Sequence, residues 1–295
     1  MRYMTTVGAV ILAIVAMASW GLAPIIYKPF MGTLDGLRAN AVKNNLAAVL
    51  GIFIGAFYVT RVSLDVLSVT GIVVATIMNI IIGDVFYMEA IRRGGVSVGT
   101  PVSYTFQVFV VLFSWLLLGE RITILGMLGT VCVVVGIFLV SYSLRDVKDV
   151  LRGVFFGLIT ALIWAVGITI YGYLLKEEVP PEVLIFLRGI IILLVFGPLA
   201  FHIMKRKDIK PRNIIMLNIG GLFGILIGSF AYYYAVYLAD NLGMITVISS
   251  ASPALSIVLS QLIFREGTML NLRWDTYVGL VLVVMGIFLT AVGGV

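Results

Sequence analysis

Four ionisable side chains lie within or beside long apolar stretches of this sequence: Lys43, Asp84, Glu89 and Arg188. A charged group at the centre of a bilayer costs at least about 2.5–3.5 kcal/mol, so such a group normally faces a cavity or an opposite charge. Lys43 and Arg188 are therefore candidates for binding an anionic group of a substrate. The alternative is that both extend their head groups to the membrane surface and only mark the ends of helices.

The two acidic residues have different surroundings. Asp84 follows 18 uncharged residues and precedes four more, which predicts a position well inside a hydrophobic helix. It could carry a coupling proton, or it could form a structural ion pair with Lys43 or Arg38. Glu89 lies closer to the arginine pair at 92–93, and pairing at i,i+3 and i,i+4 would satisfy its charge. Glu89 is therefore the weaker candidate for contact with a substrate or a proton.

Three aromatic residues and one proline complete the candidate site. Trp20 and Trp164 lie about two-thirds along their apolar stretches and could form the walls of a site for an apolar or aromatic group. Core packing is the alternative for both. Tyr232 is the tyrosine expected to face inward, because it aligns with Tyr87 in a repeat described below. Pro253 removes a backbone hydrogen bond from its helix and predicts a kink, which could act as a hinge.

The composition indicates which elements must hold these residues. Of 295 residues, 61% are hydrophobic and 12% are charged, and the mean hydropathy is +1.15. Soluble domains have about 25% charged residues, and disordered chains are poor in apolar ones, so both classes are excluded. The chain has one cysteine, Cys132, and one histidine, His202. We therefore expect no catalytic residues, no metal site and no cofactor, and an integral-membrane enzyme is a less favoured alternative.

The apolar stretches have the length of membrane-spanning helices. Ten stretches contain no Asp, Glu, Lys or Arg, and eight of them have 18 or more residues. A spanning helix needs about 20 apolar residues, with a range of about 17–25. The sequence thus predicts an all-α integral membrane protein with ten transmembrane helices, a multi-pass protein of the cell membrane. The stretches are 3–27, 44–60, 66–83, 94–119, 122–144, 153–175, 189–204, 213–239, 241–264 and 276–295.

The net charge of +6 is explained by the positions of the basic residues in the loops. With Lys43 and Arg188 assigned to the starts of helices, the connections after the odd-numbered stretches carry 14 Lys and Arg residues, whereas the other connections and the termini carry four. Cytoplasmic loops collect basic residues, so the charge requires no nucleic-acid partner. The same rule predicts that the odd-numbered connections are cytoplasmic and that both termini lie outside.

Five features recur in the same order in the two halves of the sequence, 144 to 150 residues apart. Each half, 1–144 and 145–295, would hold five helices. Because five is odd, the second half would enter the membrane from the opposite side, which predicts inverted repeats with a site between them near the midplane. The recurring features are Trp20 and Trp164, Lys43 and Arg188, Gly83 to Tyr87 and Gly228 to Tyr232, Gly119-Glu120-Arg121 and Arg265-Glu266-Gly267, and Gly129 with Gly136 and Gly279 with Gly286.

These features resemble an EamA-type domain, on the basis of Trp20-Gly21 before Lys28, the basic start of the second helix, and Gly119-Glu120-Arg121 followed by Gly129 and Gly136. Two tandem copies make up proteins of the drug/metabolite transporter superfamily. The resemblance implies ten helices and the export or exchange of small metabolites, often amino acids, without use of ATP. It also implies cytoplasmic termini, the opposite of the charge count.

The sequence predicts a secondary transporter, an exporter or exchanger of small metabolites with amino acids as one candidate class. Alternating access between two inverted halves would move the substrate. The alternatives are a sugar-phosphate or nucleotide-sugar exchanger, in which the basic pair would bind phosphate, and a membrane scaffold without transport activity. The partners expected are a small-molecule substrate and the lipid bilayer, and no oligomeric state is predicted.

Cysteine labelling in cells tests the orientation. A single cysteine placed near Lys207 should be labelled only from the cytoplasm, because that loop is strongly basic, and one placed near Val295 should be labelled only from outside. Labelling of the Val295 position from the cytoplasm would contradict the charge count and support the orientation that the resemblance implies.

Overall fold

A computed structural model describes residues 2–32, 34–142, 150–206, 208–264 and 274–293 of the chain, and every regular element in these ranges is helical. The predicted boundary at residues 144–145 and the predicted turn Arg265-Glu266-Gly267 lie outside the described residues.

The first-half elements are α1 Arg2–Tyr27, η1 Lys28–Phe30, α2 Gly36–Lys43, α3 Asn45–Val59, α4 Val66–Thr76, η2 Ile77–Gly83, α5 Asp84–Gly94, α6 Val96–Ser103, α7 Phe106–Leu118 and α8 Ile124–Tyr142. They are followed by α9 Val150–Lys176, α10 Pro181–Met204, α11 Pro211–Gly221, η3 Leu222–Gly228, α12 Ser229–Ala239, α13 Leu242–Ser249, α14 Ser252–Phe264 and α15 Trp274–Gly293.

Eight helical stretches in the described part are long and apolar enough to cross a membrane. Each corresponds to one of the predicted stretches. The other two predicted stretches contain α8 and α15, whose apolar parts 124–139 and 277–293 are shorter. The prediction of an all-α membrane protein is therefore confirmed. The eight are Thr6–Phe30, Gly36–Val59, Val66–Gly94, Val98–Leu118, Leu151–Lys176, Pro181–Met204, Pro211–Ala239 and Leu242–Ser260.

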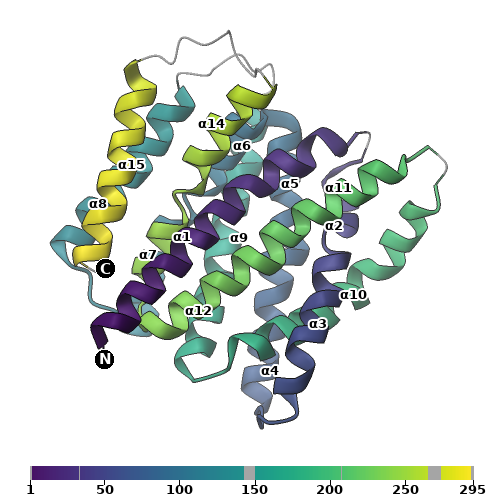
Figure 1. Ribbon diagram of the computed structural model, residues 1–295, viewed down its shortest axis with the longest axis horizontal. Helices are drawn as coiled ribbons and strands as arrows, with labels where there is room; N and C mark the ends of the chain where they lie inside the picture. Colours follow the sequence, from purple (N-terminus) through teal and green to yellow (C-terminus); the bar gives the residue numbers. More distant parts are fainter. Residues whose placement is uncertain (1, 33, 143–149, 207, 265–273, 294–295) are drawn as a thin grey trace.

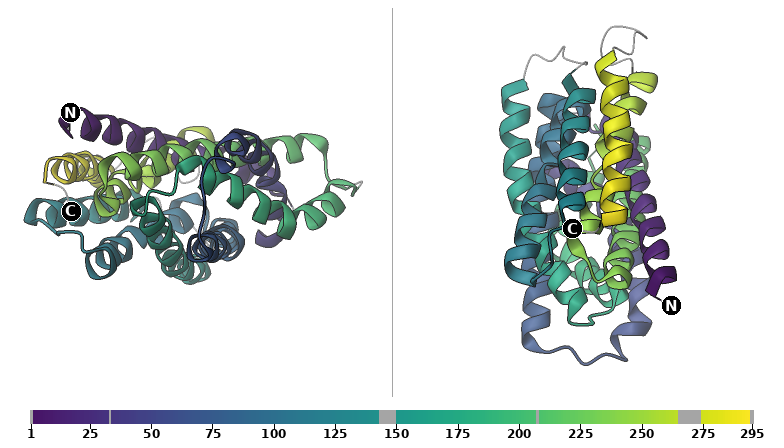
Figure 2. Two further views of the ribbon diagram at one scale, coloured as in Figure 1. Left: turned by 90° about the horizontal axis from the view of Figure 1, so that it is seen from below. Right: turned by 90° about the vertical axis from the view of Figure 1, so that its left-hand side faces the viewer.

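The helices form an elongated bundle in which elements distant in sequence lie side by side (Figures 1 and 2). Helix α1 packs along η3 and α12, while α9 packs along η2 and α5. Helix α3 packs against α10, and α8 packs against α15 at one edge of the bundle (Figure 1). Each of these pairs joins an element before residue 143 to one after residue 149, so the two sequence halves are interleaved.

Glycines bring α8 and α15 into backbone contact. A Cβ atom at Gly129 would lie 2.7 Å from the carbonyl oxygen of Gly286, and one at Gly286 would lie 2.6 Å from that of Gly129. Lipid offers no hydrophobic force for helix association, so small residues that allow close van der Waals packing hold such pairs together. The recurring glycines of the sequence therefore have a packing role at this edge.

Two of the predicted helices are interrupted. The stretch 94–119 contains α6 and α7, separated at Tyr104 and Thr105, and the stretch 241–264 contains α13 and α14, separated at Ser250 and Ala251. Pro253, for which we predicted a kink, is the second residue of α14. A proline in the first turn of a helix removes no intrahelical hydrogen bond. The structure thus has a helix start at Pro253 rather than a bend in a continuous helix.

Two π-helical segments occupy corresponding positions in the halves, η2 before α5 and η3 before α12. Such segments are rare and are frequently found at functional sites. Each ends in a glycine, Gly83 or Gly228, that the sequence repeat had already aligned. These segments form the walls of the cavity described next.

Candidate functional site

A cavity of about 70 Å³ lies in the bundle where elements of both sequence halves meet. Helices α1, α5 and α9 and the π-helical segments η2 and η3 surround it. This volume is sufficient for a few waters or a small organic molecule in the conformation described. Its polar lining residues are Lys43, Asn79, Asp84 and Ser229, and its aromatic ones are Trp20, Tyr27, Tyr87, Tyr104, Phe106 and Trp164.

The two deep tryptophans make equivalent hydrogen bonds to the π-helical segments of the opposite half. The indole nitrogen of Trp20 donates to the carbonyl of Gly224 at 2.9 Å, and that of Trp164 donates to the carbonyl of Asn79 at 3.1 Å. Gly83 provides the room for Trp164, since a Cβ there would lie 2.5 Å from the indole ring. Gly228 does the same for Trp20. These tryptophans therefore line the cavity and also join the two halves.

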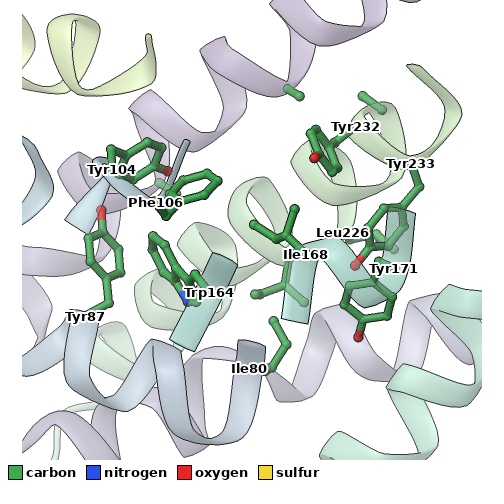
Figure 3. Packing of buried hydrophobic residues seen from close by; sticks show 14 of the residues in the cluster. Ile80, Tyr87, Tyr104, Phe106, Trp164, Ile168, Tyr171, Leu226, Tyr232 and Tyr233 are labelled. Atoms are coloured by element: carbon green, nitrogen blue, oxygen red, sulfur yellow. The ribbon is translucent and has the colours of Figure 1, made fainter. Parts of the chain in front are cut away.

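Further aromatic rings extend the walls of the cavity (Figure 3). Tyr87 lies 4.7 Å from Trp164 between ring centroids, and Tyr104, at the break between α6 and α7, lies 5.7 Å from Trp164 and 6.5 Å from Trp20. Tyr232 packs against Trp20 at 5.2 Å and forms a 2.6 Å hydrogen bond with Thr246. It is buried but is not among the lining residues of the cavity. Tyr232 thus supports the wall from behind.

Lys43 and Asp84 form an ion pair at one side of the cavity. The Lys43 amine lies 2.8 Å from the Asp84 carboxylate, and both side chains are almost fully buried. The second carboxylate oxygen of Asp84 accepts the Trp164 indole at 3.1 Å. Of the two partners predicted for Asp84, the structure has Lys43, while Arg38 pairs with Asp35. Only 4% of the surface of Lys43 is exposed, so its amine does not reach the membrane surface in this conformation.

Asparagines that sequence reasoning left without a role hold the Lys43 helix in place. Asn40 donates to the carbonyl of Ile80 in η2 at 2.8 Å, and Asn44 donates to Asn40 at 2.9 Å. Asn79 lines the cavity directly. Three asparagines lie within three residues of Lys43 in sequence, and that unusual polarity was the signal for this network. Nothing in the sequence pattern distinguished Asn79.

Arg188 is 2% exposed and lies behind the cavity wall, outside the set of lining residues. Its guanidinium donates to the Tyr233 hydroxyl at 2.8 Å and to the carbonyl of Ile225, a lining residue in η3. It also lies 5.4 Å from the Tyr233 ring centroid. Lys43 and Arg188 are both deeply buried, but only Lys43 contacts the cavity in this conformation.

Glu89 lies in the middle of α5 and is not among the lining residues of the cavity. Its carboxylate pairs with Arg92 at 2.7 Å and Arg93 at 2.9 Å, and it accepts the backbone N–H of Gly36 at 2.9 Å. The last bond holds the start of α2, the helix that carries Lys43, against α5. In this conformation Glu89 thus orients an element of the site without touching the site.

Glu120, part of the Gly119-Glu120-Arg121 turn, holds a contact between the halves that sequence reasoning did not assign. It is buried and accepts the backbone N–H groups of Leu242 at 2.7 Å and Gly243 at 2.9 Å. Its carboxylate also lies 2.9 Å from the amine of Lys176. A carboxylate at a helix N-terminus binds free N–H groups and favours the helix dipole. Glu120 thus fastens α13 of the second half to the end of α7.

Comparisons with known proteins agree with this architecture. The model of the EamA-like transporter family matches residues 7–142 and again residues 151–292. An "uncharacterized transporter" of Archaeoglobus fulgidus is 21% identical over 280 residues, which are 95% of this chain and 96% of that protein. An uncharacterized protein of Methanocaldococcus jannaschii is 28% identical over 140 residues, 46% of this chain and 93% of that protein. A crystal structure with 18% identity covers 96% of each chain at a TM-score of 0.70 and has the same fold.

Replacing Glu120 should loosen the contact between the halves. In Glu120→Ala, two backbone N–H groups and the Lys176 amine lose their acceptor, and we expect a loss of about 1–3 kcal/mol in the free energy of unfolding. Unfolding in detergent micelles measures it. Glu177→Ala removes an exposed carboxylate one residue beyond Lys176 and is the matched control. Equal stability of the two variants would contradict a role for Glu120 in holding α13.

Proposed function

Because this chain belongs to the EamA-like transporter family, we propose that it is a secondary transporter that exports or exchanges small metabolites by alternating access. The observation that carries the proposal is the cavity at the meeting of the two sequence halves, with one tryptophan of each half bonded to the other half. A site of this kind opens to either side of a membrane when the halves rock about it. The family assignment points to transport rather than to catalysis.

We further propose that the chain is built from two inverted repeats of five helices each, 1–144 and 145–295. Equivalent contacts support this proposal. Trp20 and Trp164 bond equivalent carbonyls, and Tyr87 pairs with Thr100 as Tyr232 pairs with Thr246. An odd number of helices in each repeat inverts the second one. Each half can then adopt the conformation that the other has just left.

The substrate class follows from the walls of the cavity. Most of the lining is aromatic or aliphatic, and the ion pair of Lys43 and Asp84 lies at one side. Such a site favours a small molecule with an apolar body and a charged end, and amino acids are one candidate class. A volume of about 70 Å³ favours small metabolites over the alternative, a sugar phosphate or nucleotide sugar.

Counterflow of labelled metabolites in proteoliposomes tests the function. A panel of amino acids, organic acids and sugar phosphates should include at least one that exchanges across the membrane. Trp20→Ala and Trp164→Ala should lower the rate of that exchange about tenfold or more, because each removes a wall and a bond between halves. Trp115, half exposed on α7, provides the control variant Trp115→Ala. Exchange by none of the panel, or equal loss in the control, would contradict the proposal.

Asp84 is the residue proposed to couple transport to protons. Protonation of its carboxylate would release Lys43, so the ion pair links the proton to the shape of the site. Asp84→Asn should keep exchange and lose accumulation driven by a pH gradient, both measured in proteoliposomes. Because this variant leaves Lys43 unpaired, Asp84→Asn with Lys43→Gln is the companion variant and should behave alike. Unchanged gradient-driven uptake in either variant would remove Asp84 from the coupling role.

A further inference from the structure

The buried charges next to the cavity do not balance. Lys43 has a carboxylate partner, Asp84, at 2.8 Å, so this pair is neutral as a unit. At the corresponding position of the second half, Arg188 bonds to a hydroxyl and a backbone carbonyl, which are neutral dipoles. Within the described residues, no carboxylate lies within ion-pair distance of Arg188. The residue that corresponds to Asp84 in the repeat is Ser229, which has no charge to offer.

A buried guanidinium cannot relieve this imbalance by losing its proton, because arginine stays charged in proteins. Burial of an uncompensated charge is costly, and proteins normally provide a counter-ion. Helix α10 has one carboxylate, Glu182, which is also buried. It lies six residues before Arg188, in the first turn of the helix, and accepts the Tyr234 hydroxyl. The set of Lys43, Asp84 and Arg188 thus carries a net charge of +1.

This excess charge lies against one wall of the cavity. Arg188 holds the carbonyl of Ile225, and Ile225 lines the cavity from η3. Lys43 lines the same cavity, and its backbone packs against Gly221, the residue just before η3, where a Cβ would collide with the Lys43 carbonyl oxygen. The cavity therefore has one cation in its lining, Lys43, which Asp84 balances, and a second one behind Ile225, Arg188, which no carboxylate in the described part of the chain balances.

We propose that the substrate of this transporter carries a net charge of −1 and is a small carboxylate with an apolar body. Its carboxylate binds at the η3 wall, where the unbalanced charge of Arg188 attracts it, and its apolar body lies between Trp20 and Trp164. A zwitterion would leave the excess positive charge in place, and an organic cation would add to it. This inference rests on the proposed function and adds to it the net charge of the substrate and the residue that selects it.

Ligand binding to the purified full-length protein tests the proposal directly. The chain has four tryptophans, and Trp115→Phe with Trp274→Phe removes the two that are largely exposed, so that the emission of Trp20 and Trp164 reports binding in the cavity. The probes are butyrate, 2-aminobutyrate, butyramide and butylamine, which share four carbons and differ in charge. Butyrate should bind about tenfold or more tightly than the other three. Equal or tighter binding of 2-aminobutyrate or butylamine would overturn the proposal.

Variants of Arg188 identify the residue responsible. Arg188→Gln should weaken butyrate about tenfold or more and leave butyramide unchanged. Arg188→Lys keeps the charge but loses the planar fork that holds both the Tyr233 hydroxyl and the Ile225 carbonyl, so it should bind butyrate more weakly while still preferring it to butyramide. Lys43→Arg should have the milder effect. If Arg188→Gln does not fold, Arg188→Lys carries the test, and loss of the preference for butyrate over butyramide there would contradict the proposal.

Glu182→Gln is the control for charge balance within α10. It should leave the preference for butyrate unchanged. A clear increase in that preference would overturn the proposal, because Glu182 would then be the group that compensates Arg188 in the native protein. The outcomes also separate this inference from the proposed function. Butyrate binding without counterflow of any metabolite would contradict transport and leave the anion site standing. Counterflow of a zwitterion without butyrate binding would contradict the anion site and leave transport standing.

Discussion

The cavity depends on two indole hydrogen bonds that cross between the sequence halves. In a π-helical turn a carbonyl accepts the N–H five residues later, as that of Asn79 accepts the N–H of Asp84, and its second lone pair remains available. Trp164 takes this second position. Trp20 donates to the carbonyl of the equivalent residue Gly224, which also accepts the hydroxyl of Ser229. A buried carbonyl that loses its donor is costly, so these bonds favour the packing of the two halves in this conformation. This geometry requires glycine at the ends of η2 and η3, because a side chain there would collide with an indole ring. The other aromatic rings pack around the two indoles.

The sequence alone predicts the helices and the symmetry-related residues well, because both depend on local composition. A bilayer requires long apolar stretches, and a duplication leaves Trp20 and Trp164, or Lys43 and Arg188, at a constant separation. The breaks at Tyr104 and at Ser250, and the π-helical segments, were not predictable, since they depend on packing between helices that are distant in sequence. For the same reason the role of Glu120 was not visible. Its partners are backbone N–H groups 122 and 123 residues away.

Equivalent positions differ most where the cavity is polar. Asn79 and Asp84 correspond to Gly224 and Ser229, so one half supplies the acid and the amide while the other supplies only small residues. The backbone contacts around the tryptophans stay alike in the two halves. A duplicated scaffold can therefore keep equal mechanical roles for its halves while giving the two walls different chemistry.

The charge of the cavity also affects the free energy of closing the two halves around it. Closure removes water, and each ion that enters a dry interior without a partner costs several kcal/mol. The pair of Lys43 and Asp84 is already neutral and can be enclosed at lower cost than either residue alone. Arg188 is shielded only by a hydroxyl and a carbonyl, so an anion beside it would lower the cost of enclosing the site. If the substrate supplies that anion, the loaded transporter closes more readily than the empty one. A protein with this property would favour exchange of one substrate molecule for another over return of the empty site across the membrane.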